Sequence, residues 1–327
     1  MPCSRSLTMI RNDSIDSLRA LGALLVFFSH SHVLPLTPLG YGAFWGVYLF
    51  FLVSGYCMGS TQSNQNSFGR PQNFLIKRVA RLYPAFWLSI FLYVLLVPGN
   101  TATNVLKNMT MFPRLFGGEY INSVFWTLEI ELIYYLFLFF VCLLKKGNNF
   151  FLLNSSLLIC LMLSLMAAII QVAKLGDPPY KIFLFFSLFL YGNIRFIRGA
   201  RFNFWNCFVY LSTIFLITFL IYNKTDLNSK LTLAQAFGEF FVPVIIFEIT
   251  LKYKILKIKF LELVGLISYS VYLFHMPAIF ILQKYSIFRY ETLIFSVLAL
   301  TLTLLISSLV YLVIEFPIIR FVKSKLS

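Results

Sequence analysis

The chain has 327 residues, of which 59% are hydrophobic and only 12% are charged, and it contains 38 phenylalanines. Apolar stretches of about 20 residues, the length that crosses a bilayer, follow one another along the sequence. This composition excludes an ordinary soluble protein and predicts an all-α integral membrane protein. The formal net charge of +15 would suit nucleic acid. However, the basic residues cluster in alternate connections, so we expect anionic membrane lipids as partners and no nucleic acid.

We predict a bundle of about ten transmembrane helices, with boundaries good to a few residues. The expected spans are 17–36, 41–60, 75–98, 123–144, 150–172, 181–197, 204–222, 233–251, 263–284 and 291–315. Of the 27 Lys and Arg residues, 19 lie in the connections on one side, and the positive-inside rule therefore places both termini in the cytoplasm. We expect residues 1–327 to form a single membrane domain, without an appended soluble hydrolase-like domain.

The first expected span holds Arg19 and His30 in a mostly apolar run. Basic residues precede it, as in a secretory signal, but no small-residue cleavage site follows, so we expect the span to be retained. Eleven residues return two side chains to nearly the same helix face, roughly 16 Å apart along the axis. Arg19 can then lie at the headgroups while His30 lies inside the apolar layer. At that depth His30 is either a functional group or a polar residue that ties helices together.

The third expected span begins with Arg78 and Arg81, which are three residues apart and therefore neighbours on one helix face. Arginines at this position either anchor the helix to lipid headgroups or bind a phosphate-bearing ligand through paired donors. Residues 99–122 form the longest external connection. We expect an ordinary surface loop there, with a cap over a site as the alternative.

The later spans carry few ionisable residues. Glu129 and Glu131 are two residues apart and cannot share one helix face. His275 precedes a Met-Pro step and has a structural and a catalytic interpretation. We expect Glu315 to pair with a basic neighbour near the inner surface. The five cysteines have no metal-like spacing, so we predict small buried apolar groups and no metal site at Cys3, Cys57, Cys142, Cys160 and Cys207.

Six short elements lie in a fixed order along the chain. They are Arg19 followed by ten residues and His30, with Asp16 just before; Phe50, Phe51, Ser54 and Gly55; Arg78 and Arg81; Trp126, Thr127, Leu128, Glu131, Tyr134 and Tyr135; Ser268, Tyr269, Tyr272, His275 and Pro277; and Glu315 and Pro317. Each element is weak alone, but together they cover residues 16–317. In this order they resemble the membrane-bound acyltransferase 3 family of bacterial O-acyltransferases.

The resemblance implies an enzyme of the bacterial cytoplasmic (inner) membrane. It would move an acyl group, usually acetyl, from cytosolic acyl-CoA to a hydroxyl of a carbohydrate-type acceptor. A cell-surface polysaccharide or a glycolipid would be such an acceptor. Some relatives append a domain that receives the acyl group, and this chain is expected to transfer it directly.

The resemblance also selects residues for roles that suit this chemistry. A sugar hydroxyl is a poor nucleophile at neutral pH, so a base is needed, and His30 fits that role. Glu131 is the predicted carboxylate that orients His30, in the manner of a triad. Coenzyme A carries several phosphate charges, which Arg19, Arg78 and Arg81 would bind. Further candidates are Ser54, Trp126, Tyr272, His275 and Glu315.

Two questions stay open at this stage. Ser54 either serves as a transient acyl carrier or, as we favour, marks close helix packing together with the glycine after it. The donor is cytosolic while many acceptors of such enzymes are presented outside. Therefore either the thioester reaches His30 through the bundle, or the acceptor is cytosolic.

The competing function is a multi-span transporter or flippase of a lipid-linked or polar substrate. Ten helices with a few buried charges would suit it, but no matched pair of interrupted helices is visible in the two halves of the sequence. A channel would need a ring-forming selectivity element, and none is apparent. A receptor or scaffold would leave Arg19, His30 and Glu131 unexplained together.

Overall fold

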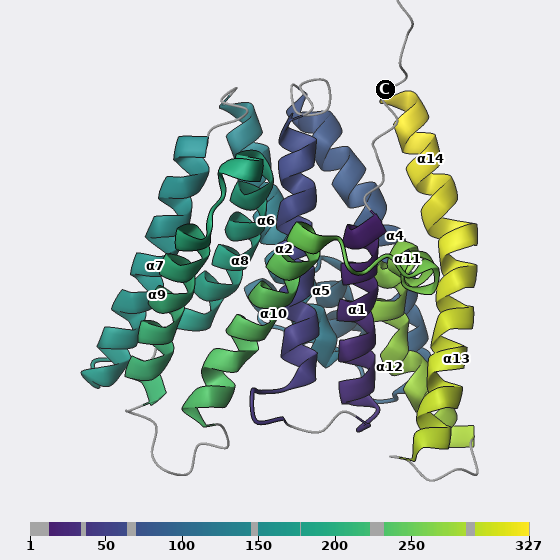
Figure 1. Cartoon of the computed structure of the whole chain (residues 1–327). Coiled ribbons are helices and arrows are strands. Elements are labelled where there is room, and N and C mark those ends of the chain that lie inside the picture. Colours follow the sequence, from purple (N-terminus) through teal and green to yellow (C-terminus); the bar gives the residue numbers. More distant parts are fainter. Residues whose placement is uncertain are drawn as a thin grey trace, which may run out of the picture.

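The computed structural model describes residues 13–33, 37–63, 70–144, 150–176, 178–222, 232–285 and 292–326. The regular elements in these ranges are helices (Figure 1). The longer ones are α1 (Asp13–His30), α2 (Gly42–Ser63), α4 (Pro71–Leu96), α5 (Ala102–Met109), α6 (Trp126–Leu143), α7 (Phe150–Val172), α8 (Tyr180–Arg198), α9 (Phe204–Tyr222), α10 (Leu233–Tyr253), α11 (Lys259–Leu266), α12 (Ser268–Tyr285), α13 (Leu293–Val310) and α14 (Phe316–Lys325). Short 3-10 turns span Pro113–Phe116, Ser123–Phe125 and Gly199–Arg201, and a π-helical turn, Tyr311–Glu315, joins α13 to α14.

The helices coincide with the expected spans, and the predicted all-α membrane bundle is confirmed. Among the described residues, eight helices are long and apolar enough to cross a membrane. The pair α11 and α12, which meet at a bend of 78°, makes a ninth when it is counted as one span. The first expected span corresponds to α1, which is not among these nine. It has 18 residues, begins with two aspartates in its first turn and ends at His30 instead of continuing to residue 36.

Helix α2 lies in the middle of the bundle, with α7 and α9 on one flank and α13 and α14 on the other (Figure 1). It packs against α8 so closely that a Cβ added at Gly55 would collide with the backbone of Phe189. A Cβ at Gly192 of α8 would likewise collide with the backbone of Leu52. Small residues permit such approach between membrane helices. The packing role expected for the Ser-Gly step therefore belongs to Gly55, which leaves Ser54 free to face other helices.

Aromatic side chains fill much of the space around α2. The ring of Tyr48 stacks on Phe240 with centroids 4.6 Å apart, and Phe51 lies 4.6 Å from Phe189. Trp126, at the start of α6, packs against Phe185 at 5.3 Å. Offset and edge-on ring pairs of this kind add packing energy beyond the area that they bury. The candidate Trp126 is thus part of the aromatic core.

The connection between α4 and α6 turns back along α4. Tyr83 Oη donates to the carbonyl of Thr110 at 3.0 Å, and Trp87 Nε1 donates to the carbonyl of Met109 at 3.0 Å. Both donors lie in the middle of α4. Met111 is buried. Many of its side chains are exposed, as expected of a surface loop, but the connection also packs beside the middle of α4, and we call residues 99–122 the re-entrant segment for this reason.

Asn108 holds this re-entrant segment together. Its Nδ2 donates to the carbonyl of Glu119 at 2.8 Å, and its Oδ1 accepts from the backbone of Ile121 at 3.1 Å. At the rim, Tyr120 donates to the Glu129 carboxylate. Burial and this carboxylate raise the pKa of Tyr120, so the phenol stays protonated and remains a donor.

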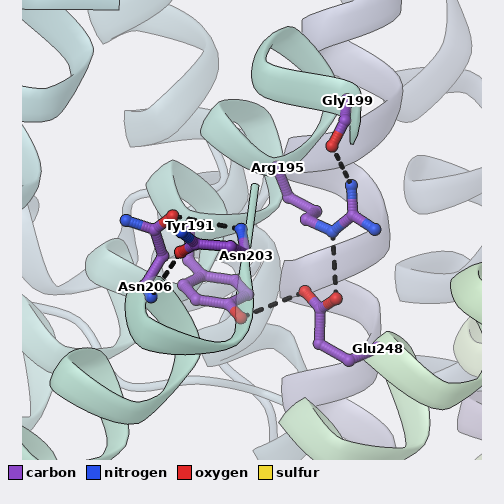
Figure 2. Close-up of polar contacts among 6 residues, drawn as sticks. All are labelled: Tyr191, Arg195, Gly199, Asn203, Asn206 and Glu248. Atoms are coloured by element: carbon purple, nitrogen blue, oxygen red, sulfur yellow. Dashed lines mark hydrogen bonds and ion pairs between the residues drawn. The ribbon is translucent and has the colours of Figure 1, made fainter. Parts of the chain in front are cut away.

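A polar cluster joins α8 to α10 (Figure 2). Arg195 Nε lies 2.9 Å from a carboxylate oxygen of Glu248, and its Nη1 donates to the carbonyl of Gly199 at 3.0 Å. Tyr191 Oη donates to the other Glu248 oxygen at 3.0 Å. Both carboxylate oxygens of Glu248 have a partner and Arg195 donates to two acceptors, so we assign this cluster a structural role.

Candidate active site

A pocket with an empty volume of about 720 Å³, part of which is open to solvent, lies between α1, α2, α4, α6 and α12. These elements are distant in the sequence, and each contributes polar side chains to the lining. Six of the ten predicted site residues line the pocket, namely Arg19, Ser54, Arg78, Arg81, Glu131 and Tyr272. The structure therefore brings together the predicted phosphate-binding arginines, the predicted carboxylate and the candidate serine.

The three arginines reach the pocket from two helices. Arg19 comes from α1, and Arg78 and Arg81 come from neighbouring positions of α4, as their spacing predicted. Arg81 is close enough to act electrostatically on both of the others. Within the described parts of the chain, none of the three forms an ion pair; the ion pair that the structure shows there joins Arg195 to Glu248.

Arg78 is held mainly by aromatic faces. Its guanidinium lies 5.5 Å from the ring centre of Phe74 and 5.6 Å from that of Tyr135. Its Nη2 makes a long contact of 3.4 Å with Thr61 Oγ1, and its buried Nε has no hydrogen-bond partner among the described residues. Stacked guanidinium groups with unused donors suit an anionic ligand, because arginine binds phosphate with several donors at once.

Glu131 lies near enough to Arg78 and Arg81 to act on their charges, and it accepts two hydroxyl hydrogen bonds. Ser54 Oγ donates to Glu131 Oε1 at 2.7 Å, and Tyr135 Oη donates to the same oxygen at 2.5 Å. Glu129 points to Tyr120 instead. The two glutamates thus face different neighbours, as their two-residue spacing requires.

His30 lies at the last position of α1 and does not line the pocket. Its Nδ1 is 2.9 Å from the carbonyl oxygen of Val26. A carbonyl only accepts, so Nδ1 carries the hydrogen, and Nε2 is the basic nitrogen of the neutral ring. The side chain is therefore oriented by its own helix, and the chemistry expected of a general base falls to Nε2.

His275 of α12 faces the same region. Its ring centre is 5.1 Å from that of His30, and its Nδ1 is 2.7 Å from the carbonyl oxygen of Tyr272. The side chain is 1% exposed. Its proximity to His30 could not be derived from the sequence, because the two residues lie at opposite ends of the chain.

Glu315 accepts a hydrogen bond from Ser270. Arg81 and Arg19 are near enough for their charges to act on it, although among the described residues the expected ion pair with a basic neighbour does not form. Cys57 also lines the pocket, whereas the sequence predicted only a small buried apolar group there. The signal for Cys57 was its position three residues after Ser54, which places both on one face of α2. Cys3 lies outside the described residues.

A family model described as an acyltransferase domain, for the acyltransferase 3 family, matches residues 12–312. The chain belongs to the acyltransferase 3 family. The resemblance read from six short elements is thereby confirmed over nearly the whole chain. No curated protein and no solved structure matched the chain.

For an acyltransferase 3 protein, the pocket combines two kinds of polar group. The arginines supply positive charge, with an unused donor at Arg78 Nε, and the Ser54–Glu131–Tyr135 network supplies a carboxylate beside a hydroxyl. The predicted contact between His30 and Glu131 stays a prediction, since the bonds described here tie each of them to other partners. In the described part of the chain, no three His, Cys, Asp or Glu residues are grouped as metal ligands would be.

Proposed function

We propose that the protein is an integral membrane O-acyltransferase of the bacterial cytoplasmic membrane. It moves an acyl group, most simply acetyl, from cytosolic acyl-CoA to a hydroxyl of a carbohydrate-type acceptor such as a cell-surface polysaccharide or glycolipid. The observation that carries this proposal is the pocket lined by Arg19, Arg78 and Arg81 in a chain of the acyltransferase 3 family. Three guanidinium groups without ion-pair partners among the described residues suit a ligand with several phosphate charges.

The length of α1 allows donor binding and catalysis to occur at different positions along the helix. Arg19 and His30 are eleven residues apart, which corresponds to roughly 16 Å along the helix axis. A donor whose phosphates bind the arginines can therefore extend its flexible arm along the bundle, so that its thioester approaches His30. The acceptor then meets the thioester at the His30 end of α1.

The proposed acyl transfer at His30 needs only the two substrates and the histidine base. His30 Nε2 takes the proton of the acceptor hydroxyl as the oxygen attacks the thioester carbonyl. The carbon–sulfur bond then breaks, and the leaving thiolate receives the proton from Nε2. The products are an ester on the acceptor and free coenzyme A. Glu131 is proposed as the carboxylate that supports the base, and its hydrogen bonds to Ser54 and Tyr135 hold it in place.

The decisive experiment compares purified wild type with the His30→Ala variant in lipid nanodiscs. Acetyl-CoA and a soluble saccharide acceptor are supplied, and release of free coenzyme A thiol is followed by a chromogenic thiol reagent. We expect thiol release by the wild type and a fall of at least about 100-fold in the variant, because a positioned base contributes 10²–10⁴-fold.

Absence of thiol release from both proteins, with several acyl-CoAs and with equal folding of the two samples, would count against an acyltransferase. Movement of a lipid-linked sugar across vesicles by the same wild-type sample would instead favour the flippase. Mass spectra of surface glycans from cells with and without the gene then identify the acceptor.

A further inference from the structure

The two histidines at the His30 end of α1 form a pair with matched geometry. In each ring, Nδ1 lies within hydrogen-bond distance of a main-chain carbonyl oxygen, Val26 for His30 and Tyr272 for His275. Each Nδ1 therefore carries the hydrogen, and each neutral ring presents Nε2 as an acceptor. The ring centres are 5.1 Å apart with a tilt of 51°. Two acceptors cannot bond to each other, so the resting pair has no direct hydrogen bond to form.

The Nε2 atom of His275 is buried and has no hydrogen-bond partner among the described residues. The whole side chain is 1% exposed. A histidine that only ties helices together is expected to have both nitrogens hydrogen-bonded, because an unsatisfied buried acceptor is destabilising. At this position the unused acceptor is available to a neighbouring group that becomes a donor during the reaction.

The pair also adjoins the pocket. The Tyr272 ring lines the pocket and lies 5.8 Å from the His275 ring, centre to centre. Its Oη is anchored to the carbonyl of Val124 at 2.9 Å and lies 2.7 Å from Thr127 Oγ1. Because these contacts fix the side chain of Tyr272, they also help to fix its main-chain carbonyl, to which His275 Nδ1 donates. The position of His275 is therefore set by the wall of the donor pocket.

We propose that His275 is a positioning residue for the base His30, an inference that rests on the proposed acyl transfer. When His30 Nε2 takes the proton of the acceptor hydroxyl, it changes from an acceptor into a cationic donor. His275 Nε2 then shares the Nε2–H of His30 with the substrate atoms as a second acceptor, in a three-centre hydrogen bond, and stabilises the imidazolium until the proton passes from His30 to the leaving thiolate. The bond exists only while His30 is protonated, so it lowers the barrier without strengthening the binding of either substrate.

The test uses two polar variants that separate the two nitrogens of His275. In His275→Asn the amide can still donate to the Tyr272 carbonyl, but nothing occupies the place of Nε2. In His275→Gln the longer side chain can place a carbonyl oxygen near the Nε2 position, where it can accept. His32→Asn is the control, because His32 has a positive φ of 59° that asparagine adopts readily.

Turnover and the Michaelis constant for acetyl-CoA are measured by thiol release, with melting temperature in detergent as the folding check. We expect kcat to fall about 10- to 100-fold in His275→Asn, as a lost hydrogen bond to a charged group predicts, with an unchanged Michaelis constant for the donor. His275→Gln should retain most of the turnover, and His32→Asn should match the wild type. The double variant His30→Ala/His275→Asn should be no slower than His30→Ala alone, because His275 acts through His30.

Equal turnover in the Asn and Gln variants, high or low, would overturn the positioning role, as would a double variant clearly slower than His30→Ala. These results require an active wild type. An inactive wild type overturns the proposed acyl transfer itself, and the two failures are thereby distinguished.

Discussion

At the scale of single residues, the feature that most restricts function is the group of arginines in the pocket. Arg81 repels both Arg19 and Arg78, and no carboxylate forms an ion pair with any of the three in the described parts of the chain, although Glu131 and Glu315 act on Arg81 from a distance. The repulsion between these arginines disfavours their close placement in the empty protein, because charges held in a low-dielectric interior interact strongly. A polyanionic ligand removes that repulsion, so binding and stability should be coupled at this site.

Removing one of these charges should weaken donor binding more than catalysis. We expect Arg78→Gln to raise the Michaelis constant for acetyl-CoA about tenfold or more, since a charge-assisted contact to phosphate contributes more than about 1.4 kcal/mol. The measurement is thiol release as a function of acetyl-CoA concentration. Arg198→Gln is the matched control, because Arg198 lies over the Phe150 ring and does not line the pocket. An unchanged donor dependence in Arg78→Gln would remove this residue from the donor site.

Residue types and spacing predicted much of this pocket but not all of it. The three-residue spacing of Arg78 and Arg81 placed both on one face of α4, and the two-residue spacing of Glu129 and Glu131 separated those two. The carbonyl that orients His30 belongs to Val26, a side chain with no polar group of its own. Hydrogen bonds to main-chain carbonyls of this kind cannot be predicted from the side-chain types in the sequence.

At the scale of elements, α2 combines two tasks on adjacent residues. Gly55 allows α8 to approach, while Ser54 donates to Glu131 of α6 in the pocket lining. Successive helix positions are about 100° apart, so one face of α2 can carry packing and the next can carry chemistry. A shift of α2 against α8 would therefore move Ser54 as well, and helix packing and pocket geometry are linked.

A larger residue at the contact between α2 and α8 should disturb both packing and activity. We expect Gly192→Val to lower the free energy of unfolding by about 1–3 kcal/mol, the usual effect of overpacking a close contact. The melting temperature in detergent and the turnover by thiol release should fall together. Leu305→Val, at a side chain that is 64% exposed on α13, is the control and should change neither. A stable Gly192→Val protein would show that α8 can move away from α2 without loss.

The re-entrant segment between α4 and α6 is an element that sequence patterns did not predict. Its Pro-Gly-Asn, Phe-Pro-Arg and Phe-Gly-Gly steps are typical of any surface turn. What draws it against α4 is a set of individual hydrogen bonds, from Tyr83 and Trp87 to the main chain and around Asn108. Apolar periodicity carries no information about such bonds.

At the scale of the whole molecule, the arginines of α4 and the histidine pair are displaced from each other along the bundle. Figure 1 shows the end of α2, the start of α4 and the end of α14 on one side and the end of α1 on the opposite side. Arg78 lies in the second turn of α4, near the first side, and His30 ends α1 at the second. This polarity suits a donor and an acceptor that arrive from different sides of the membrane.

Sidedness of donor use follows from this arrangement. The concentration of basic residues predicts that the side on which α4 begins and α14 ends is cytosolic. In proteoliposomes with the protein in one orientation, acetyl-CoA should be consumed when it is supplied on the side that carries a cleavable tag placed after residue 327. Cleavage of the tag by external protease gives the orientation. Consumption only from the opposite side would reverse the proposed direction of transfer.

Hydropathy alone predicted the helical bundle because a bilayer imposes one length on every span. It was less successful for α1, which carries Asp16 and Arg19 and ends at His30. It also did not show the bend of 78° between α11 and α12. Both deviations occur where a helix contributes polar groups to the site. Functional sites are where a sequence most often departs from the regular pattern of its structural class.

The π-helical turn Tyr311–Glu315 has a consequence for how this chain can vary in length. Such a turn holds one residue more than an α-helical turn, while α13 and α14 on either side keep α-helical geometry. Deletion of one residue elsewhere in a helix rotates every later side chain by about 100°. Deletion of one residue from this turn would convert it to ordinary α-helix, so α14 would keep the direction of its side chains relative to α13. A chain shorter by one residue in this turn is therefore expected to keep both helices in place, whereas the same deletion elsewhere in α13 or α14 would not.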